Sequence, residues 1–411
     1  MVTRDFVAIM MAGLWSIPVV AQTADFGVDV PVTLSGGTFY SQRLQLKDPN
    51  AFPWAAGVQG MLYPTVKLGQ HWFGYAAIQI RSNPYVYYDA FSPQHDVETD
   101  VLQAYVGYSI GGKRASMVVK AGRLVSAFGA FPLLYDDARN PLLDQPLSYI
   151  TTLTLRADQL PCGTSDLLGQ RPGAVSFHCG GELGPGSNFV PATLYGLPGI
   201  EADVSAGRFD ARVQLTNESP LYWEDFRNTG EYLQWAAGGG YTISQGFRVG
   251  ISAYRGPYLD QDLTPLLPTG TSVRDFPASA VGADVKWARG RWSTSGELQR
   301  FRFDSPNFVV SPSILSGYVE GKSVITPRFY AAGRAAWLHP ESVLDNTGVY
   351  AAHYAGRLQS YEAATGFWIT RNQLLKFSYE WLKPENTTGT RFNIFGFQYV
   401  IKLDPLVMAF R

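Results

Sequence analysis

The sequence contains few charged residues for its length. Asp, Glu, Lys and Arg make up 16% of the 411 residues, whereas soluble domains usually contain about 25%, and the net charge is −1. This balance argues against a basic surface for nucleic acid and against an acidic tail. Aromatic residues (14%) and the 42 glycines are abundant, and the mean hydropathy is close to zero. The composition favours a transmembrane β-barrel over a cytosolic protein without deciding between them.

The chain also lacks a long apolar run after its first residues. An apolar segment at 6–20 contains Pro18, and Val19-Val20-Ala21 is a small-residue sequence typical of a cleavage site. We expect residues 1–21 to be a secretory signal peptide and 22–411 to form one mature domain. A membrane-anchor helix is the alternative, but the run is short and the proline interrupts it. No later stretch approaches the roughly 20 apolar residues of a helical span, so no transmembrane helix is expected.

Cysteine is limited to Cys162 and Cys179, which are separated by a stretch that contains glycine and proline. In an exported protein such a pair is expected to form a disulfide. The alternative is a metal site that includes His178, but two thiolates and one imidazole lack the fourth ligand that zinc prefers. No metal or cofactor is therefore expected.

What the sequence does contain is a strict alternation of apolar and polar residues. The segment 199–216 shows it clearly, with a tight reversal at Ala206-Gly207, and is expected to form a β-hairpin. One face carries Ile200, Val204, Phe209 and Val213, and the other carries Glu201, Asp203, Arg208, Asp210 and Arg212. In a soluble sheet the apolar face would enter a core. In a transmembrane barrel it would face lipid, and the charged face would line a wet lumen.

The same alternation recurs along the chain between connections of two lengths. Short turns such as 289–290 alternate strictly with long loops such as 256–277, and aromatic residues tend to lie at strand ends. This pattern predicts an all-β fold, a transmembrane antiparallel up-and-down β-barrel with short periplasmic turns and long extracellular loops. About 16 strands (14–18) are expected, at 32–46, 56–67, 72–82, 97–110, 114–123, 191–205, 208–217, 232–244, 247–255, 278–288, 291–302, 313–324, 328–338, 357–370, 373–383 and 391–402. A further hairpin at 147–155 would raise this number.

The end of the chain leaves two alternatives open. Outer-membrane barrels commonly end in an aromatic residue that the barrel-assembly machinery reads, whereas here Phe410 is next to last and Asp404-Pro405 precedes it. Either the last strand continues past a bulge to Phe410, or it ends near Leu403.

Two segments resemble a known protein family. The run Ala121-Gly-Arg-Leu-Val-Ser-Ala-Phe-Gly129 is similar to a Gly-Arg-Phe-x-x-Pro-Phe-Gly sequence of bacterial outer-membrane porins, with Ala127 in place of the proline. The segment 140–161 is similar to a loop of uncharacterised porin-like proteins. The chain therefore resembles outer-membrane porins, especially the phosphate-selective (O/P-type) and related porin-like families. The resemblance implies a barrel in the lipid of the bacterial outer membrane, a role in diffusion and a homotrimer, but no particular substrate.

The barrel prediction places many charged side chains on the lumen face. Opposed cationic and carboxylate side chains would create a transverse field that favours polar solutes, whereas rings of one sign would select ions by charge. The alternative is that these side chains only pair with one another and keep the wall solvated. The candidate pore-lining residues are Arg81, Lys120, Arg123, Glu201, Asp203, Arg208, Asp210, Arg212, Arg248, Asp284, Lys286, Glu297, Arg328, Arg334, Glu362, Lys376 and Glu380.

The longest connection, 124–190, is the strongest functional candidate because loops of this length usually have a function. Its apolar residues would be costly on a solvated loop, and they are Phe128, Phe131, Leu133, Leu134, Leu142, Leu143 and Leu147. We expect the loop to fold into the lumen as a constriction. The alternative is an external cap over the barrel mouth that the disulfide holds in place. Asp136 and Asp137 could bind Ca²⁺, although they lack the ligand spacing of a calcium site.

Sequence motifs of catalysis are lacking. His71 lies in a short turn and the other four histidines, His95, His178, His339 and His353, lie in long loops, so none is expected beside a serine on a strand face. P-loop and His-Glu-x-x-His sequences do not occur. Because strands are expected soon after the cleavage site, no plug domain is expected either. We predict a non-enzymatic passive diffusion channel for small hydrophilic solutes or ions. A structural or adhesive barrel with a closed lumen is the second hypothesis, and an outer-membrane enzyme a distant third.

Overall fold

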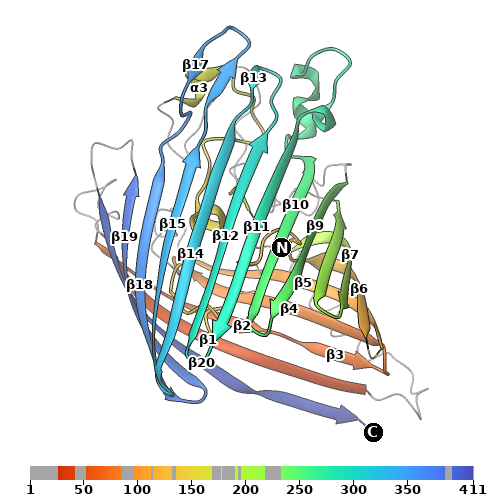
Figure 1. The fold of residues 1–411 in the computed structure, drawn as a ribbon, viewed down its shortest axis with the longest axis vertical. Helices are drawn as coiled ribbons and strands as arrows, with labels where there is room; N and C mark the ends of the chain where they lie inside the picture. Colours follow the sequence, from red (N-terminus) through yellow and green to blue (C-terminus); the bar gives the residue numbers. More distant parts are fainter. Residues whose placement is uncertain are drawn as a thin grey trace.

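Sixteen antiparallel strands, each hydrogen-bonded to two neighbours, close into a barrel in the computed structural model of the protein (Figure 1). The structure describes residues 26–41, 52–85, 96–112, 114–131, 136–168, 177, 190–192, 196–217, 233–384 and 391–410, with the backbone alone described over 404–410. The fold class is the one that the alternating pattern predicts.

The barrel strands pair in chain order. They are β1 (Phe26–Ser41), β2 (Trp54–Leu62) with its continuation β3 (Thr65–Leu68), β4 (Trp72–Asn83), β5 (Asp96–Gly111), β6 (Ala115–Leu124), β7 (Leu197–Ala206), β8 (Phe209–Thr216), β9 (Gln234–Ser244), β10 (Phe247–Pro257), β11 (Pro277–Arg289), β12 (Trp292–Phe303), β14 (Ser313–Thr326), β15 (Phe329–Pro340), β18 (Leu358–Thr370), β19 (Gln373–Pro384) and β20 (Phe392–Phe410). We count β2 and β3 as one strand because both lie between β1 and β4, on either side of an interruption at Tyr63-Pro64.

The first and last strands close the barrel. β1 pairs with β20 from Phe26 opposite Phe410 to Ser41 opposite Ile394, with a shift of register between Val30 and Val32. The shift lies opposite Asp404-Pro405, where proline cannot donate a ladder hydrogen bond. The last strand therefore continues past an irregularity to Phe410, which is the first of the two alternatives that the sequence left open.

Several strand boundaries differ from the prediction, and the largest differences arise from pairing that is not local. The first strand, expected at 32–46, lies at Phe26–Ser41 because the extension of β20 gives its first residues a partner. The strand expected at 191–205 begins at Leu197, which lies opposite the last residue of β6. The segment 147–155 forms no barrel hairpin and contains the short helix α2 (Leu147–Ile150) instead.

Glycines make the tightest turns at one rim of the barrel. Gly207 and Gly290 adopt φ values of +61° and +60° in the two-residue turns β7–β8 and β11–β12. Two-residue reversals of this kind need the left-handed conformation that glycine adopts without steric cost. Because successive strands run in opposite directions, all short turns lie at this rim and all long connections at the other.

Other small elements lie mostly at the long-loop rim (Figure 1). They are the separate sheet of β13 (Phe308–Val310), β16 (Val343–Asp345) and β17 (Tyr350–Ala351), the 3₁₀-helices η4 (Gln261–Leu266) and η5 (Val273–Asp275), and the helix α3 (Thr164–Leu167). None of the helices in the described ranges is both long and apolar enough to cross a membrane.

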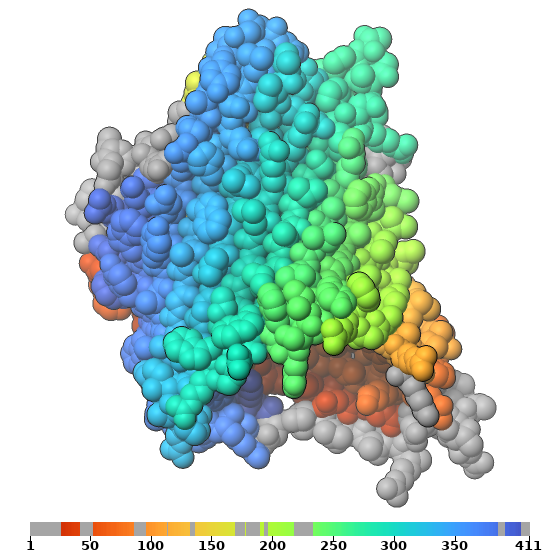
Figure 2. Space-filling model, in the orientation of Figure 1, coloured from red at the N-terminus to blue at the C-terminus, as the bar shows by residue number. Residues whose placement is uncertain are grey.

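The two faces of the wall are sorted as the hairpin at 199–216 predicts. Ile200, Phe209 and Val213 are 54%, 64% and 53% exposed on the outer face, whereas Glu201 is only 6% exposed on the inner one. In the space-filling view the strands coloured green to blue form a continuous outer wall (Figure 2). The polar side chains that alternate with these apolar residues in the hairpin therefore point into the barrel.

Candidate functional site

The long connection between β6 and β7 lies in the interior of the barrel at 125–131 and 136–149, two stretches that the structure describes. Its apolar residues Phe128, Phe131 and Leu142 are all at most 1% exposed, packed against the inner wall. The Tyr330 hydroxyl, near the short-turn end of β15, donates to the carbonyl oxygen of Pro141 at 3.1 Å. The segment thus reaches from the end of β6 down toward the short-turn rim. This is the inward path that its apolar residues predict.

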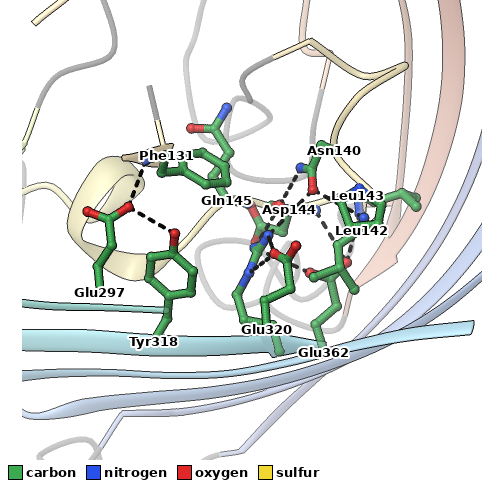
Figure 3. A network of polar contacts seen from close by, with 12 residues as sticks. Phe131, Asn140, Leu142, Leu143, Asp144, Gln145, Glu297, Tyr318, Glu320 and Glu362 are labelled. Atoms are coloured by element: carbon green, nitrogen blue, oxygen red, sulfur yellow. Dashed lines mark hydrogen bonds and ion pairs between the residues drawn. The ribbon is translucent and has the colours of Figure 1, made fainter. Parts of the chain in front are cut away.

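Glu297 on β12 forms the first attachment point of this loop (Figure 3). Its carboxylate accepts the backbone N–H of Phe131 at 2.7 Å and the hydroxyl groups of Tyr149 and Tyr318, each at 2.9 Å. Gln299 donates to it at 2.8 Å. Burial, and then the charge of Glu297, raise the pKa of Tyr149 well above its usual value, so that its hydroxyl stays a donor. A buried carboxylate is stable here because four donors replace its water.

Glu362 and Arg334 form the second attachment point. Glu362 accepts the backbone N–H groups of Leu143 and Asp144 at 2.9 and 3.2 Å (Figure 3). Arg334 donates to the Asp144 carbonyl oxygen at 2.8 Å and forms an ion pair with Glu320 at 2.7 Å. The guanidinium also lies 3.7 Å from Glu362. Side chains of β14, β15 and β18 therefore hold one tight bend of the loop.

Lys376 on β19 forms the third attachment point. Lys376 is 0% exposed, and its ammonium donates to the carbonyl oxygens of Asp137, Leu142 and Asn140 at 2.8, 3.1 and 3.3 Å. An ammonium has three N–H donors, and here each of them has an acceptor in the loop. The loop backbone thus takes the place of water around a buried cation.

The acidic pair of the loop binds wall side chains. Asp137 accepts the hydroxyl groups of Ser35 and Tyr85, each at 2.6 Å, and Asp136 accepts the hydroxyl of Tyr63 at 2.7 Å. No group of three metal-binding side chains occurs in the part of the chain that the structure describes. The two carboxylates therefore anchor the loop to β1 and to the β2–β4 region. From the sequence alone, these same aspartates are candidate Ca²⁺ ligands.

The outer end of the same loop is attached to the small sheet at the long-loop rim. The Asp345 carboxylate on β16 accepts the backbone N–H of Thr164 at 2.8 Å, and the Thr164 hydroxyl donates to the carbonyl oxygen of Val349 at 3.0 Å. The backbone N–H of Thr164, and then the hydroxyl of Thr347 at 2.7 Å from the Asp345 carboxylate, hold the pKa of Asp345 below its usual range. The loop is thus held at both ends of the barrel.

A cavity of about 460 Å³ remains on the other side of the interior. Its wall is formed by strands from β4 to β11, and the loop contributes Val125, Gly129, Ala130 and Arg139. Its charged side chains are Lys120, Arg139, Arg212, Arg248 and Lys286, and Glu201, Asp203, Asp210 and Asp284. The lining is therefore strongly polar, with cations and carboxylates interspersed.

Two cations of the cavity each bridge two carboxylates. Lys120 lies 2.8 Å from Glu201 and 2.5 Å from Asp203, across the β6–β7 pair. Arg248 on β10 lies 2.6 Å from Asp210 and 2.7 Å from Asp284, on strands to either side.

The remaining cations of the cavity are bound differently. Arg212 donates to the carbonyl oxygen of Gly129 in the loop. In the described ranges, Arg139 and Lys286 lie within 4 Å of no carboxylate oxygen.

The predicted pore-lining residues fall into four groups. Glu297, Arg334, Glu362, Lys376 and Glu380 are buried, and the last accepts the Ser360 hydroxyl at 2.5 Å. Lys120, Glu201, Asp203, Asp210, Arg212, Arg248, Asp284 and Lys286 line the cavity. Arg81 pairs with Glu98 at 3.2 Å, and Arg123 donates to the carbonyl oxygen of Gly196 at 3.0 Å. Arg208 and Arg328 each lie in a short turn, immediately before a strand, and both are exposed at the rim.

Sequence reasoning missed three contributors. Gln214, on the polar face of the hairpin, binds the backbone of Val125 and Ala127 at 2.9 and 3.1 Å. Arg139 lies on the loop, where no alternation marks its direction. Gly240 makes room for a side chain, since a Cβ atom there would lie 2.2 Å from the Arg248 guanidinium. Of these three residues, only Gln214 could have been found from the sequence, because it lies on the polar face of the alternation together with the charged residues.

The cysteines and histidines add little to the site. Cys162 donates its backbone N–H to Asp166 at 2.8 Å, and the described residues contain no free cysteine. Cys179 lies outside the described residues, so its pairing with Cys162 stays a prediction. His71 and His353 each contact a backbone carbonyl oxygen through Nδ1, at 2.8 and 3.1 Å.

Comparisons with known proteins support the architecture. No protein-family model matches the chain, and no curated protein matches its sequence. Among solved structures it is similar to the outer-membrane channel DcaP of Acinetobacter baumannii, with a TM-score of 0.53 and 9% identity over 92% of this chain and 98% of that one. It is also similar to the trimer form of in-vitro folded OmpT, an outer membrane protein of Vibrio cholerae (TM-score 0.52, 9% identity, 92% and 99%).

A third similar structure is an anion-selective porin from Comamonas acidovorans (TM-score 0.50, 9% identity, 93% and 99%). Identities this low establish the fold alone. The narrower resemblance to phosphate-selective porins stays a prediction. The chain has the 16-strand barrel fold of outer-membrane porins and channels.

Proposed function

We propose that the protein is an outer-membrane porin, a passive diffusion channel for small hydrophilic solutes or ions. The observation that supports this most directly is the cavity of about 460 Å³ between the loop and the strand wall. Nine charged side chains around one space are costly to desolvate, so such a lining requires water. In this proposal the loop narrows the lumen, and solutes pass along the cavity side.

The cavity also suggests a weak preference for anions. Five cationic and four carboxylate side chains line it, and Lys120 and Arg248 bridge all four carboxylates. Arg139, Arg212 and Lys286 are then left to attract negative charge. The field of these three cations would act on any ion that crosses the narrowed section.

The remaining expectations concern export and assembly. We propose a cleaved signal peptide at 1–21, a mature barrel at 22–411 surrounded by outer-membrane lipid, insertion by the barrel-assembly machinery and a homotrimer without enzymatic activity. Intact mass of the exported protein tests cleavage after Ala21, and its change on reduction tests the Cys162–Cys179 bridge. Chemical cross-linking in membranes tests the trimer, and monomers alone would exclude it.

Single-channel recording in planar bilayers tests the channel. The folded protein should give stepwise conductance, and asymmetric salt should give a small reversal potential of the sign expected for anions. A correctly folded barrel that inserts without conductance would overturn the proposal and leave a structural or adhesive barrel with a closed lumen.

A further inference from the structure

The two rims of the barrel differ in charge. The seven short turns, at 69–71, 112–114, 207–208, 245–246, 290–291, 327–328 and 371–372, contain no Asp or Glu. Five of them contain Lys or Arg, namely 112–114, 207–208, 290–291, 327–328 and 371–372. Each of the eight long connections, in contrast, contains at least one acidic residue. The short-turn rim is therefore cationic, although the chain as a whole has a net charge of −1.

The turn between β11 and β12 has arginine N–H donors that are available to an external partner. Arg289 and Arg291 flank Gly290, and both are exposed. Arg291 donates one N–H to the carbonyl oxygen of Ile325 at 3.4 Å, which leaves the other four N–H groups of its guanidinium for an external partner. Within the described ranges, neither arginine lies within 4 Å of a carboxylate oxygen.

Aromatic side chains place this turn at a membrane interface. Trp287 and Trp292 are 38% and 60% exposed on the outer face, and Trp292 lies opposite Arg289 in the β11–β12 ladder. Trp72 and Phe209, 52% and 64% exposed, likewise follow directly after short turns. Exposed tryptophans mark the boundary between acyl chains and headgroups. Arginines one or two residues beyond them lie at the level of lipid phosphates.

The opposite end of the same strand provides the contrast. Arg300 and Arg302 on β12 are also exposed on the outer face, close to the long-loop rim. There, Arg300 pairs with Glu341 at 2.9 Å and Arg302 with Asp304 at 2.6 Å. Both cations are thus neutralised by carboxylates of the protein, whereas no carboxylate of the described ranges pairs with Arg289 or Arg291.

We propose that the short-turn rim binds the phosphate groups of anionic phospholipids, with Arg289 and Arg291 as a principal site. A guanidinium binds phosphate through two parallel N–H donors, and a local excess of cations favours headgroups with net negative charge. The flanking tryptophans contact the glycerol and upper acyl region of the same lipid. The proposal depends on the barrel and its outer face, and not on conductance through the lumen.

Native mass spectrometry of the detergent-solubilised full-length protein tests this surface. The protein is titrated with phosphatidylglycerol, with phosphatidylcholine and with inorganic phosphate, and retained ligands are measured. The wild type should retain phosphatidylglycerol in preference to phosphatidylcholine. The double variant Arg289→Gln/Arg291→Gln should bind phosphatidylglycerol at least about tenfold more weakly, since each basic residue near a membrane surface contributes about fivefold.

The matched control is Arg300→Gln/Arg302→Gln, which removes two exposed arginines from the other end of β12. It should retain phosphatidylglycerol like the wild type, and both variants should show the heat-dependent gel migration of a folded barrel. Equal loss in both variants, no loss in either, or equal binding of the two lipids by the wild type would overturn the proposal. Binding of inorganic phosphate with the affinity of phosphatidylglycerol would also overturn it, because the ligand would then be a free anion.

Discussion

The two halves of the barrel interior use the same kind of strand in different ways. On β12 to β19 the inward Glu297, Glu362, Arg334 and Lys376 bind the backbone of the loop. On β6 to β11 the inward charges bind mainly one another around a cavity. Alternation therefore determines which side chains point inward. Whether an inward side chain holds the loop or lines the cavity depends on whether the loop backbone packs against it.

Exposure follows this division. Arg334 and its partner Glu320 have side chains only 2% and 7% exposed, whereas Arg248 and Asp210 are 27% and 42% exposed. A buried charge that loses its partner destabilises a protein far more than one in contact with water. Mutations in the two halves should therefore affect different properties, stability on the loop side and ion selectivity on the cavity side.

The largest effect is expected for Arg334→Met. The substitution keeps much of the side-chain volume but leaves the buried carboxylates of Glu320 and Glu362 without their cation. The free energy of unfolding should fall by about 3–5 kcal/mol, measured by urea denaturation of the barrel in lipid vesicles. Arg248→Met is the matched control in the other half and should cost at most about 1 kcal/mol. Equal losses in the two variants would contradict the distinction between the halves.

A change in selectivity is expected for Arg248→Met itself. The substitution removes one cation from the cavity and releases Asp210 and Asp284, so the lining gains net negative charge. The reversal potential in asymmetric salt should shift toward the sign expected for cations, away from the weak anion preference expected of the wild type. Arg300→Met, an equivalent loss of charge on the outer face, should leave the reversal potential unchanged. A similar shift in this control would show that the cavity does not set selectivity.

The smallest effect is expected for Gly240→Ala on β9. The new Cβ atom would lie 2.2 Å from the guanidinium of Arg248, whose flexible end can move away while the strand keeps its place. The contact with Asp210 should weaken, and the reversal potential should shift in the same direction as in Arg248→Met but less. Gly321→Ala is the control, because no atom lies within 4 Å of its added Cβ. Identical recordings for both variants would show that the Arg248 geometry has no influence on ion flow.

Much of the fold could be predicted from the sequence because its signals are local. Period-two alternation and short turns located all sixteen strands, since a barrel wall needs one polar and one apolar face everywhere. The boundaries that failed depend on partners far along the chain. Phe26 has a strand partner only because β20 continues to Phe410, and nothing near Phe26 indicates this.

The candidate site was predictable to a lesser degree. The inward direction of Glu362 and Arg248 follows from alternation, but their different roles depend on the path of the loop. That path is set by carbonyl and N–H groups at Leu143 and Asp144, which every residue carries and no sequence pattern reveals. Arg139 was missed for the same reason, because a loop has no period that assigns directions to its side chains.

The attachment of the loop has a consequence for the order of folding. Leu143 binds Glu362 at a separation of 219 residues along the chain, and Asp137 binds Lys376 at a separation of 239. Contacts of such long range close late, since the chain entropy of the intervening segments must be lost first. The loop can dock only when β18 and β19 have joined the wall. During refolding we therefore expect protease protection of the loop to develop last, after β-sheet formation is complete by circular dichroism.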